Sequence, residues 1–270
     1  MSPYDPSGCC SLTVFILSEK PINFAVSFIT DTKDKQNMAT SGQGIGYTGE
    51  DRLEEYISVH LEPESRLLRE LYRETNLKLI NPRMASGHIQ GRLLKMLVTM
   101  IRPHLVLEIG TFTGYATLCM AEGLPEGGEI HTIEIDDELE DFICKNIKKS
   151  PFSDRIRLHI GNALETVPQL GLMFDMIFLD GEKTEYPDYY TAFMKYLRPG
   201  GYMIADNTLW DGHVVDGNYD SDPQTAAVKK FNDMVHADRQ VETAIIPIRD
   251  GLTIIRKKMK TGPKPTPRPK

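Results

Sequence analysis

Among its 270 residues the chain has only four cysteines and no uninterrupted apolar run of membrane-spanning length. A transmembrane helix needs about 20 mostly apolar residues, and the best candidate, residues 11–30, is broken by Glu19, Lys20 and Pro21. This segment is also a poor secretory signal, because Asp5 and no lysine or arginine precedes its apolar part. Two cysteines are adjacent and two lie in helical patterns, so they do not form a disulfide framework. We therefore expect a reducing, cytoplasmic location without membrane contact.

Basic residues are outnumbered by acidic ones. The sequence holds 31 Lys and Arg against 38 Asp and Glu, a net charge of −7. Seven of the basic residues fall within residues 256–270, which contain no acidic residue, so the rest of the chain is near −14. Because phosphate binding depends on cationic neutralisation, so acidic a body is a poor non-specific binder of nucleic acid. The apolar fraction of 40% and the charged fraction of 26% exclude a wholly disordered or collagen-like chain.

Two terminal segments differ from the rest of the chain. Residues 1–49 lack clear periodicity and end in a glycine-rich stretch, so we predict a flexible N-terminal extension there. An extra strand pair over 13–17 and 24–29 is the alternative. Residues 259–270 carry four prolines and several cations, which predicts a disordered basic tail. The remainder, 50–258, is predicted to be one domain.

Helical periodicity and short apolar runs alternate along this domain. Alternation of this kind indicates βαβ units and an α/β fold with a mostly parallel sheet. An Asp-Gly pair between two apolar runs near the end predicts an antiparallel hairpin. No internal repeat is present. The expected strands are 105–109, 130–135, 156–160, 176–179, 202–205, 241–248 and 252–256, and the expected helices are 53–61, 67–71, 89–101, 114–123, 137–149, 189–197 and 224–236.

The first candidate site is a glycine turn after the strand 105–109. Its glycines, Gly110 and Gly114, are spaced Gly-x-x-x-Gly, which disfavours a dinucleotide site with Gly-x-Gly-x-x-Gly. Such a turn lets a ligand approach backbone N–H groups, although glycine-terminated strands are common. Glu108 would repel a pyrophosphate and attract a cationic group such as an α-ammonium. Glu134, near the end of the next strand, could accept hydrogen bonds from a ribose or simply be a solvated strand end.

Three oxygen-bearing side chains follow two later strands. Asp180 ends the run 176–179, and Asp206 and Asn207 end the run 202–205. Because consecutive βαβ strands place their carboxyl ends side by side, we expect these side chains to converge. Two carboxylates and an amide oxygen suit Mg²⁺, Mn²⁺ or Ca²⁺ better than zinc. Each residue alone could merely cap or turn a strand end, and the convergence favours the metal site.

Lys183 stands three residues after Asp180. A neighbouring cation and partial burial would both lower its pKa. We therefore predict that Lys183 is a general base for a hydroxyl acidified by the metal. Without the metal, a surface lysine between Glu182 and Glu185 would be the default interpretation.

Taken together, these motifs resemble the cation-dependent O-methyltransferases, the family of catechol and caffeoyl-CoA O-methyltransferases, and most of all its bacterial branch. The resemblance covers residues 53–257 and implies a Rossmann-like, seven-stranded, mostly parallel sheet with an antiparallel last strand and helices on both faces. The motifs that carry it are Met84-Ala85-Ser86, Gly91-Arg92-Leu93-Leu94, the segment from Val106 to Tyr115, Gly161-Asn162-Ala163-Leu164, Asp180-Gly181-Glu182-Lys183 with Tyr186, and the segment from Ala205 to Trp210.

The resemblance also implies a cofactor, a cation and a base. The cofactor would be S-adenosylmethionine, the cation Mg²⁺, with Mn²⁺ or Ca²⁺ as alternatives, and the base Lys183. The acceptor would be a small catechol-like or phenolic molecule, whose hydroxyl the metal acidifies and whose oxygen then attacks the sulfonium methyl in line. The implied cofactor residues are Met84, Ser86, Glu108, Gly110, Thr111, Ala116, Glu134, Ala163 and Asp180, and the implied metal ligands are Asp180, Asp206 and Asn207.

The chain departs from the family pattern at three places. Ala116 replaces a usual serine, so one hydroxyl contact to the methionine carboxylate is lost. Gly181-Glu182 replaces the more common Ala-Asp and could shift the loop, and Asn162 stands where aspartate is frequent. None of these departures removes a metal ligand, so we expect an active enzyme.

Three other functions stay open at this point. One is methylation of a modified-uridine hydroxyl in tRNA, which the basic tail favours and the acidic body disfavours. Another is a non-catalytic relative that binds S-adenosylmethionine, and a third is an NAD-dependent reductase. Family members dimerise, so the expected partners are a second copy of the chain and a small-molecule acceptor. Trp210, His213 and Tyr219, together with residues near Met84, are expected to line the acceptor pocket.

Overall fold

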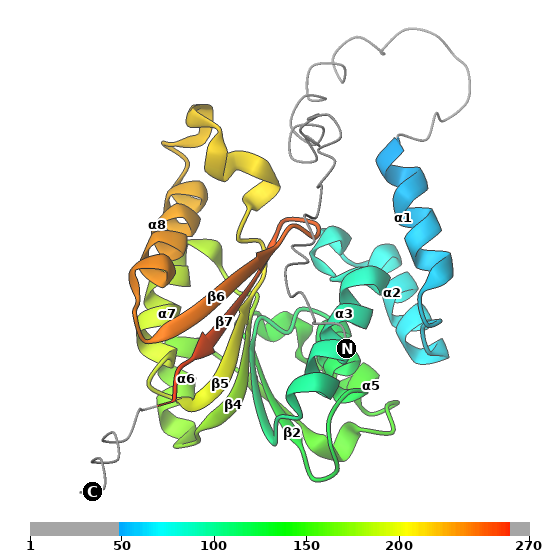
Figure 1. The fold of residues 1–270 in the computed structure, drawn as a ribbon. Coiled ribbons are helices and arrows are strands. Elements are labelled where there is room, and N and C mark those ends of the chain that lie inside the picture. The colour runs from blue at the N-terminus through cyan, green and yellow to red at the C-terminus, as the bar shows by residue number, and fades with distance from the viewer. Residues whose placement is uncertain (1–48, 260–270) are drawn as a thin grey trace, which may run out of the picture. The chain divides into compact units, whose positions relative to one another are not determined.

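A computed structural model describes residues 49–259, and its centre is a seven-stranded sheet (Figure 1). The strand order is β3-β2-β1-β4-β5-β7-β6. Neighbours among β1 to β5 are parallel, whereas β7 runs antiparallel to both β5 and β6. This confirms the predicted sheet with its reversed last strand. The strands are β1 (Leu105–Ile109), β2 (Glu129–Glu134), β3 (Ile156–Ile160), β4 (Phe174–Leu179), β5 (Leu197–Ala205), β6 (Val241–Ile246) and β7 (Leu252–Lys257).

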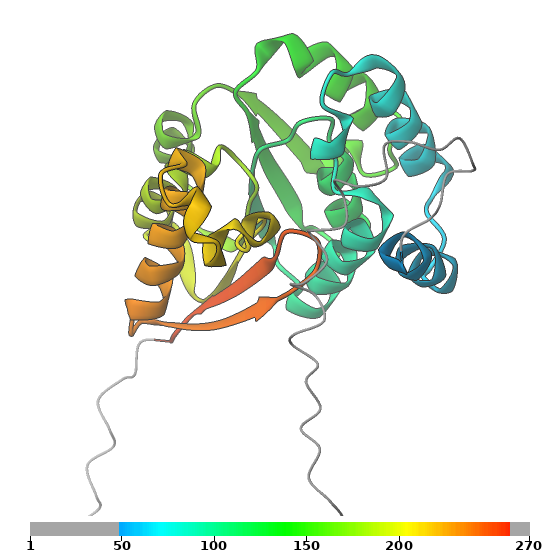
Figure 2. The ribbon, with the colours of Figure 1, turned by 90° about the horizontal axis from the view of Figure 1, so that it is seen from above.

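Helices cover both faces of the sheet, as the views from the side and from above show (Figures 1 and 2). Helices α2 to α5 pack on one face, and α6 to α8 pack on the other. The sheet is therefore buried on both sides, as parallel sheets usually are. The helices are α1 (Gly49–His60), α2 (Arg66–Lys78), α3 (Gly87–Ile101), α4 (Tyr115–Ala121), α5 (Glu140–Ile147), α6 (Ala163–Leu170), α7 (Tyr186–Phe193) and α8 (Pro223–Ala237).

The two faces hold separate hydrophobic clusters, because successive side chains of a strand point to opposite sides. In β1, Val106 joins the cluster under α2 to α5, and Leu107 joins the cluster under α6 to α8. In β4, Phe178 and Leu179 divide in the same way. All four side chains are fully buried. This double packing fixes the strand ends, which are the points where the candidate site residues begin.

Several element bounds differ from the sequence-based prediction; α7, for example, is Tyr186–Phe193 rather than 189–197. Two differences change the type of a whole segment. Strand β5 begins at Leu197 rather than at 202, and the pairing between β4 and β5 shifts register at its start. The segment Arg198-Pro199-Gly200-Gly201 therefore belongs to the strand. The shift in register accommodates Gly200, whose φ is +85°, inside it. Helix α6 was not predicted. It contains Pro168, which weakens a helical pattern, but the side chain of Asn162 caps its start by accepting from the Leu164 N–H.

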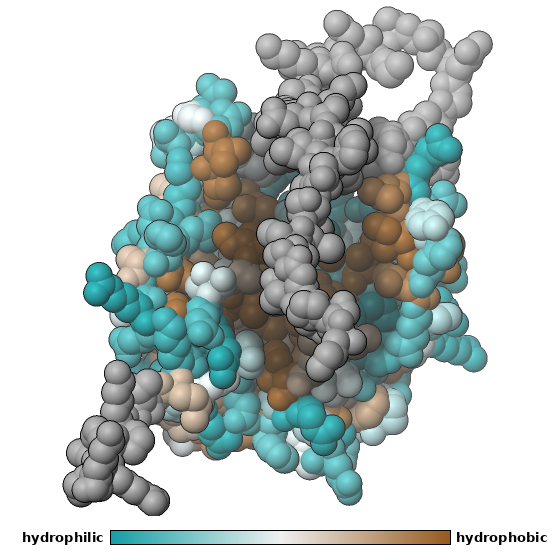
Figure 3. Space-filling model, viewed as in Figure 1, coloured by the Kyte–Doolittle hydropathy of each residue, from teal (hydrophilic) through white to brown (hydrophobic). Residues whose placement is uncertain are grey.

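The surface is hydrophilic over most of the rim seen in Figure 3, with hydrophobic side chains along α1. Leu53, Tyr56 and Val59 are the exposed apolar residues of this helix. In the part of the chain that the structure describes, no helix is both long and apolar enough to cross a membrane. The strand pair suggested over 13–17 and 24–29 lies outside the described residues. The predicted extension and basic tail lie almost entirely outside them, and both stay predictions.

Candidate active site

The candidate residues gather at the carboxyl edge of the sheet because β1, β4 and β5 end in register. Ile109 pairs with Leu179, and Leu179 pairs with Ala205. The next residues, Gly110, Asp180 and Asp206, therefore lie side by side, and the Asp206 N–H donates to the carbonyl of Leu179 at 2.9 Å. The predicted convergence of the strand ends is confirmed.

Gly110 is required at this edge for two reasons. Its φ of +94° lies in the left-handed region that favours glycine. A Cβ at this position would stand 2.3 Å from the carbonyl oxygen of Asp180. The turn therefore places its bare backbone directly against the start of the Asp180 loop.

Glu108 is a buried carboxyl group with one unsatisfied oxygen. Its side chain is wholly inaccessible, and its Oε2 accepts a hydrogen bond from the hydroxyl of Thr117 in α4. Its Oε1 is buried and has no hydrogen-bond partner among the described residues. Burial raises the pKa of Glu108 to about 8, so the carboxyl group is mostly protonated at pH 7. A buried, unpaired acceptor of this kind marks a place where a cationic donor would be stabilised.

Glu134 fixes the conformation of the glycine turn. Its Oε2 accepts from the N–H of Phe112 at 2.7 Å, and its Oε1 accepts from the N–H groups of Ile135 at 2.9 Å and Asp136 at 3.0 Å. Phe112 has φ +50°, a strained value for a residue with a side chain. The carboxylate thus joins the end of β2 to the turn after β1. Since Oε2 has a second lone pair, it can still accept a hydrogen bond from a ligand hydroxyl.

Asp180 and Asp206 form an acidic pair in which Asp206 is buried and Asp180 is partly exposed. Asp206 is 5% exposed. Burial and, next, the Asp180 charge raise the pKa of Asp206. Asn207 follows at φ +56°, and its Nδ2 donates to Oδ2 of Asp250 at 3.1 Å. Residues 49–259 contain no cluster of three or more His, Cys, Asp or Glu that could hold a metal ion, and the candidate set here is two carboxylates and an amide.

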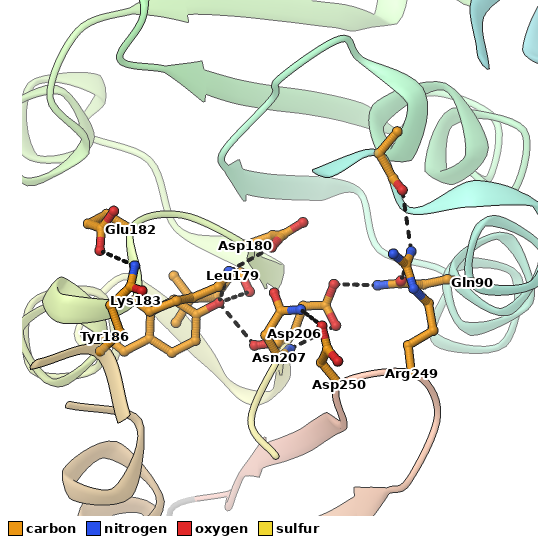
Figure 4. Close-up of polar contacts among 12 residues, drawn as sticks. Gln90, Leu179, Asp180, Glu182, Lys183, Tyr186, Asp206, Asn207, Arg249 and Asp250 are labelled. Atoms are coloured by element: carbon orange, nitrogen blue, oxygen red, sulfur yellow. Dashed lines mark hydrogen bonds and ion pairs between the residues drawn. The ribbon is translucent and has the colours of Figure 1, made fainter. Parts of the chain in front are cut away.

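Lys183 lies between Asp180 and Tyr186 in the close-up of Figure 4. Its Nζ is 2.9 Å from Oδ1 of Asp180 and 3.0 Å from the Tyr186 hydroxyl, and the residue is 8% exposed. The predicted lowering of its pKa assumed a bound cation, and without one the protein's own groups act in the opposite direction. Burial lowers the pKa of Lys183, but the Asp180 carboxylate and Tyr186 raise it more. A lower pKa therefore requires a cation that takes up the Asp180 charge.

The remaining predicted cofactor residues lie around the same edge. Ser86 is buried immediately before α3, and its carbonyl accepts from the guanidinium of Arg249. Thr111 is buried in the glycine turn and shares a hydrogen bond of 2.5 Å with Thr132 of β2. The others are Ala116, buried in α4, Ala163, buried at the first position of α6, and Met84, which is 59% exposed in the short 3₁₀ helix Pro82–Met84.

Sequence reasoning assigned no role to four residues that contact the predicted ones. Gln90 of α3 donates to Asp206, and Arg249 bonds to Gln90. Asp250 accepts from Asn207, and Tyr186 contacts both Lys183 and the carbonyl of Asp206. One signal was available: Gln90 is a polar residue beside the apolar stripe of residues 89–101.

Tyr186→Phe is expected to impair the site without unfolding the protein. The hydroxyl accepts from Lys183 and donates to the carbonyls of Asp206 at 3.0 Å and Leu179 at 3.2 Å. Loss of a hydrogen bond to a charged group costs about 1.5–3 kcal/mol, so we expect kcat to fall about tenfold or more and urea unfolding to show a loss of about 1–2 kcal/mol. Tyr190→Phe, which removes a hydroxyl bonded to Asp238, is the matched control. An unchanged kcat in Tyr186→Phe would refute this role.

Comparison with known proteins identifies the family. The family model described as O-methyltransferase matches residues 55–258, which is most of the chain. The chain belongs to the O-methyltransferase family. This confirms the predicted resemblance, and the protein is accordingly an O-methyltransferase.

Curated relatives and solved structures agree with this assignment. A catechol O-methyltransferase of Niastella koreensis is 32% identical over 61% of this chain and 76% of its own. A caffeoyl-CoA O-methyltransferase of Eucalyptus gunnii is 32% identical over 84% of this chain and 97% of its own. The O-methyltransferase of Bacillus cereus, solved in complex with SAH, has 28% identity and a TM-score of 0.70, covering 77% of this chain and 97% of its own. TomG of Streptomyces achromogenes, solved with SAM, has 27% identity and a TM-score of 0.72, covering 78% and 100%.

Proposed function

We propose that this O-methyltransferase transfers the methyl group of S-adenosylmethionine to a hydroxyl of a small catechol-like or phenolic acceptor, with help from a divalent cation. The observation that carries the proposal is that Asp180 and Asp206, each one residue beyond its strand, lie beside the glycine turn. Asn207 follows Asp206 directly, and Lys183 bonds to Asp180. S-adenosylmethionine supplies an electrophilic methyl group, and a divalent cation lowers the pKa of an acceptor hydroxyl when bound.

The glycine turn fits a cofactor with a cationic amino-acid end. The unpaired Oε1 of Glu108 is the acceptor that an α-ammonium would satisfy. Glu134 keeps a free lone pair for a ribose hydroxyl, and Ala163 lies at the start of α6 after the neighbouring strand β3. The relatives solved with SAM and with SAH share this fold.

The acidic pair fits a hard divalent cation. Carboxylate and amide oxygens are the donors that Mg²⁺ prefers. Burial and the Asp180 charge raise the pKa of Asp206, so a positive charge beside the two carboxylates would stabilise the ionised form of Asp206. Asn207 bonds Asp250 through its Nδ2, so its amide oxygen is the atom available to a cation. We propose Mg²⁺ as the cation, with Mn²⁺ or Ca²⁺ able to replace it.

Lys183 is the proposed general base. It is buried, and Tyr186 and Asp180 hold its Nζ in place. In the chain's own field the lysine stays protonated. It can accept the acceptor's proton only when the negative charge of Asp180 is neutralised. Base and cation are therefore interdependent in this site.

An aromatic segment beside the site suits a flat acceptor. It follows Asn207 directly and includes Trp210, His213 and Tyr219. The rings of His213 and Tyr219 stack with centroids 3.6 Å apart and planes 7° apart. Trp210 and Asp211 hold positive φ values of 48° and 49°, so the chain turns sharply here. A ring-shaped acceptor would gain stacking and apolar contacts on such a surface.

Glu108 provides a test of cofactor binding. With a pKa of about 8 it holds its proton at pH 7, and an ammonium group beside it would favour the ionised form. Binding of S-adenosylmethionine should therefore release most of a proton per site at pH 7, and affinity should rise from pH 6 to pH 7. Isothermal titration calorimetry in buffers of different ionisation enthalpy measures both quantities.

The matched variant is Glu108→Gln, which keeps the size of the side chain and cannot ionise. We expect it to bind S-adenosylmethionine without proton release and without the rise in affinity. Equal proton release by both proteins would refute the contact between Glu108 and the ammonium. A thermal shift with NAD in place of S-adenosylmethionine would refute the proposed cofactor itself.

A further inference from the structure

The hairpin turn between β6 and β7 is tied by Arg249 to the segment that enters α3. This residue holds φ +47° in the turn. Its Nη1 donates to the carbonyls of Ser86 and Ala85, the latter at 3.3 Å, and to Oε1 of Gln90 at 3.0 Å. Its Nη2 donates to the carbonyl of Arg83 at 3.4 Å. One guanidinium thus joins the hairpin to the segment that enters α3, about 160 residues earlier in the chain.

Gln90 passes this contact on to Asp206. Its side chain is 1% exposed, and its Nε2 donates to Oδ2 of Asp206 at 2.5 Å (Figure 4). The orientation of the amide follows from its partners. Arg249 can only donate hydrogen bonds, so it must face the amide oxygen, and the NH₂ group must then face the carboxylate. Without Arg249 the amide could turn over and present its oxygen to the carboxylate.

The same turn fixes the second candidate ligand. Oδ2 of Asp250 accepts from Nδ2 of Asn207, which leaves the Asn207 oxygen toward the site. The carbonyl of Asp250 accepts from the N–H groups of Leu209 at 2.7 Å and Trp210 at 3.1 Å, and the carbonyl of Gly251 accepts from the Thr208 N–H at 3.1 Å. The turn therefore holds the backbone that follows Asn207 as well as its side chain.

We propose that Arg249 and Gln90 are positioning residues that fix the Asp206 carboxylate in the geometry required to bind a divalent cation. The inference rests on the proposed metal dependence and extends it to residues that would not touch the cation. Oδ1 of Asp206 accepts from the Asn207 N–H at 2.8 Å, and Oδ2 accepts from Gln90, so the carboxylate cannot rotate freely. Residues that orient metal ligands in this way commonly change metal affinity by about 10–100-fold.

The test is a titration of the whole protein with Mn²⁺, in which electron paramagnetic resonance measures the concentration of the free ion. Gln90→Met keeps the length of the side chain but removes both hydrogen bonds, and Arg249→Met removes the guanidinium. We expect each to weaken Mn²⁺ binding about 10–100-fold. The double variant should be no weaker than Gln90→Met, because both residues act through one amide. Arg256→Met is the control, since Arg256 lies on the same hairpin and pairs with Glu242 instead.

Calorimetric binding of S-adenosylmethionine to metal-free Gln90→Met separates positioning from general damage. We expect its affinity to stay within about threefold of wild type, because the residue's two hydrogen bonds go to Asp206 and Arg249. If the losses of Mn²⁺ affinity in Gln90→Met and Arg249→Met multiply in the double variant, the proposal that Arg249 acts through Gln90 is overturned. Should Gln90→Met not fold, Arg249→Met carries the test, because Arg249 is exposed.

The outcomes distinguish this inference from the proposed function. If wild type binds Mn²⁺ and Asp206→Ala does not, but Gln90→Met and Arg249→Met bind like wild type, the positioning role is refuted and the metal site stands. If wild type binds no Mn²⁺, the proposed metal site is refuted, and the positioning role of Gln90 and Arg249 is refuted with it.

Discussion

Replacing Asp206 and Asn207 together by alanine is expected to lower methyl transfer at least about 1,000-fold. A bound cation contributes several kcal/mol to a transition state that carries developing charge on oxygen, and about 4 kcal/mol corresponds to three decades in rate. The double variant leaves Asp180 as the single candidate ligand of the three. It also leaves the buried amide of Gln90 without its acceptor, so we expect a loss of about 1–3 kcal/mol in the free energy of unfolding.

The measurement is initial-rate methyl transfer from labelled S-adenosylmethionine at saturating Mg²⁺, with urea unfolding of the same preparation. Asp233→Ala, which removes an exposed aspartate of α8, is the control and should leave both quantities unchanged. We expect the double variant to bind S-adenosylmethionine, because the glycine turn and Glu108 are intact. Full activity of a folded, EDTA-washed double variant would rule out the metal mechanism.

Replacing Lys183 by methionine is expected to lower kcat by about 10²–10⁴-fold, the usual contribution of a positioned general base. Methionine keeps the apolar stem of the side chain and removes the group 2.9 Å from Asp180 and 3.0 Å from Tyr186. Lys183→Arg should be nearly as slow, because guanidinium keeps the positive charge but does not give up its proton. Comparing kcat of the two variants separates the contribution of the positive charge from that of proton transfer.

Lys195→Met is the control for this pair, since Lys195 is an exposed lysine that lies over the ring of Tyr196, away from the acidic pair. Cation binding should persist in Lys183→Met and become tighter, because a positive charge next to Asp180 is gone. Wild-type kcat in Lys183→Arg would show that Lys183 acts through its charge alone, and the role of base would then be withdrawn.

The strand ends could be predicted from sequence because short apolar runs determine them. Runs ending at Ile109, Leu179 and Ala205 are buried on both faces, so their length fixes where the polar residues begin. Consecutive βαβ units then place Asp180 and Asp206 together without further information. The family resemblance added the number of strands and a role for each site residue. The sheet is confirmed, and the roles stay predictions.

The contacts around Asp206 could not be predicted, because they join parts of the chain that no local pattern connects. Gln90 and Arg249 are 159 residues apart, and the sequence indicates only a helix for the first and a turn for the second. Asp250 was taken as a turn residue, although its side chain also holds Asn207. The direct bond of Lys183 to Asp180, which raises the pKa of the lysine when no cation is bound, could not be predicted either. These are properties of distance and burial, which sequence spacing does not contain.

The most direct test of the central claim is methyl transfer by the wild-type protein before and after removal of divalent cations. Labelled S-adenosylmethionine is offered with a panel of catechols, caffeoyl esters and bulk tRNA, first after dialysis against EDTA and then with Mg²⁺ returned. We predict methylation of a small vicinal-diol or phenolic acceptor that falls at least about 100-fold with EDTA and recovers with Mg²⁺. Methylation that persists unchanged in EDTA, or that labels tRNA alone, would contradict the proposed function.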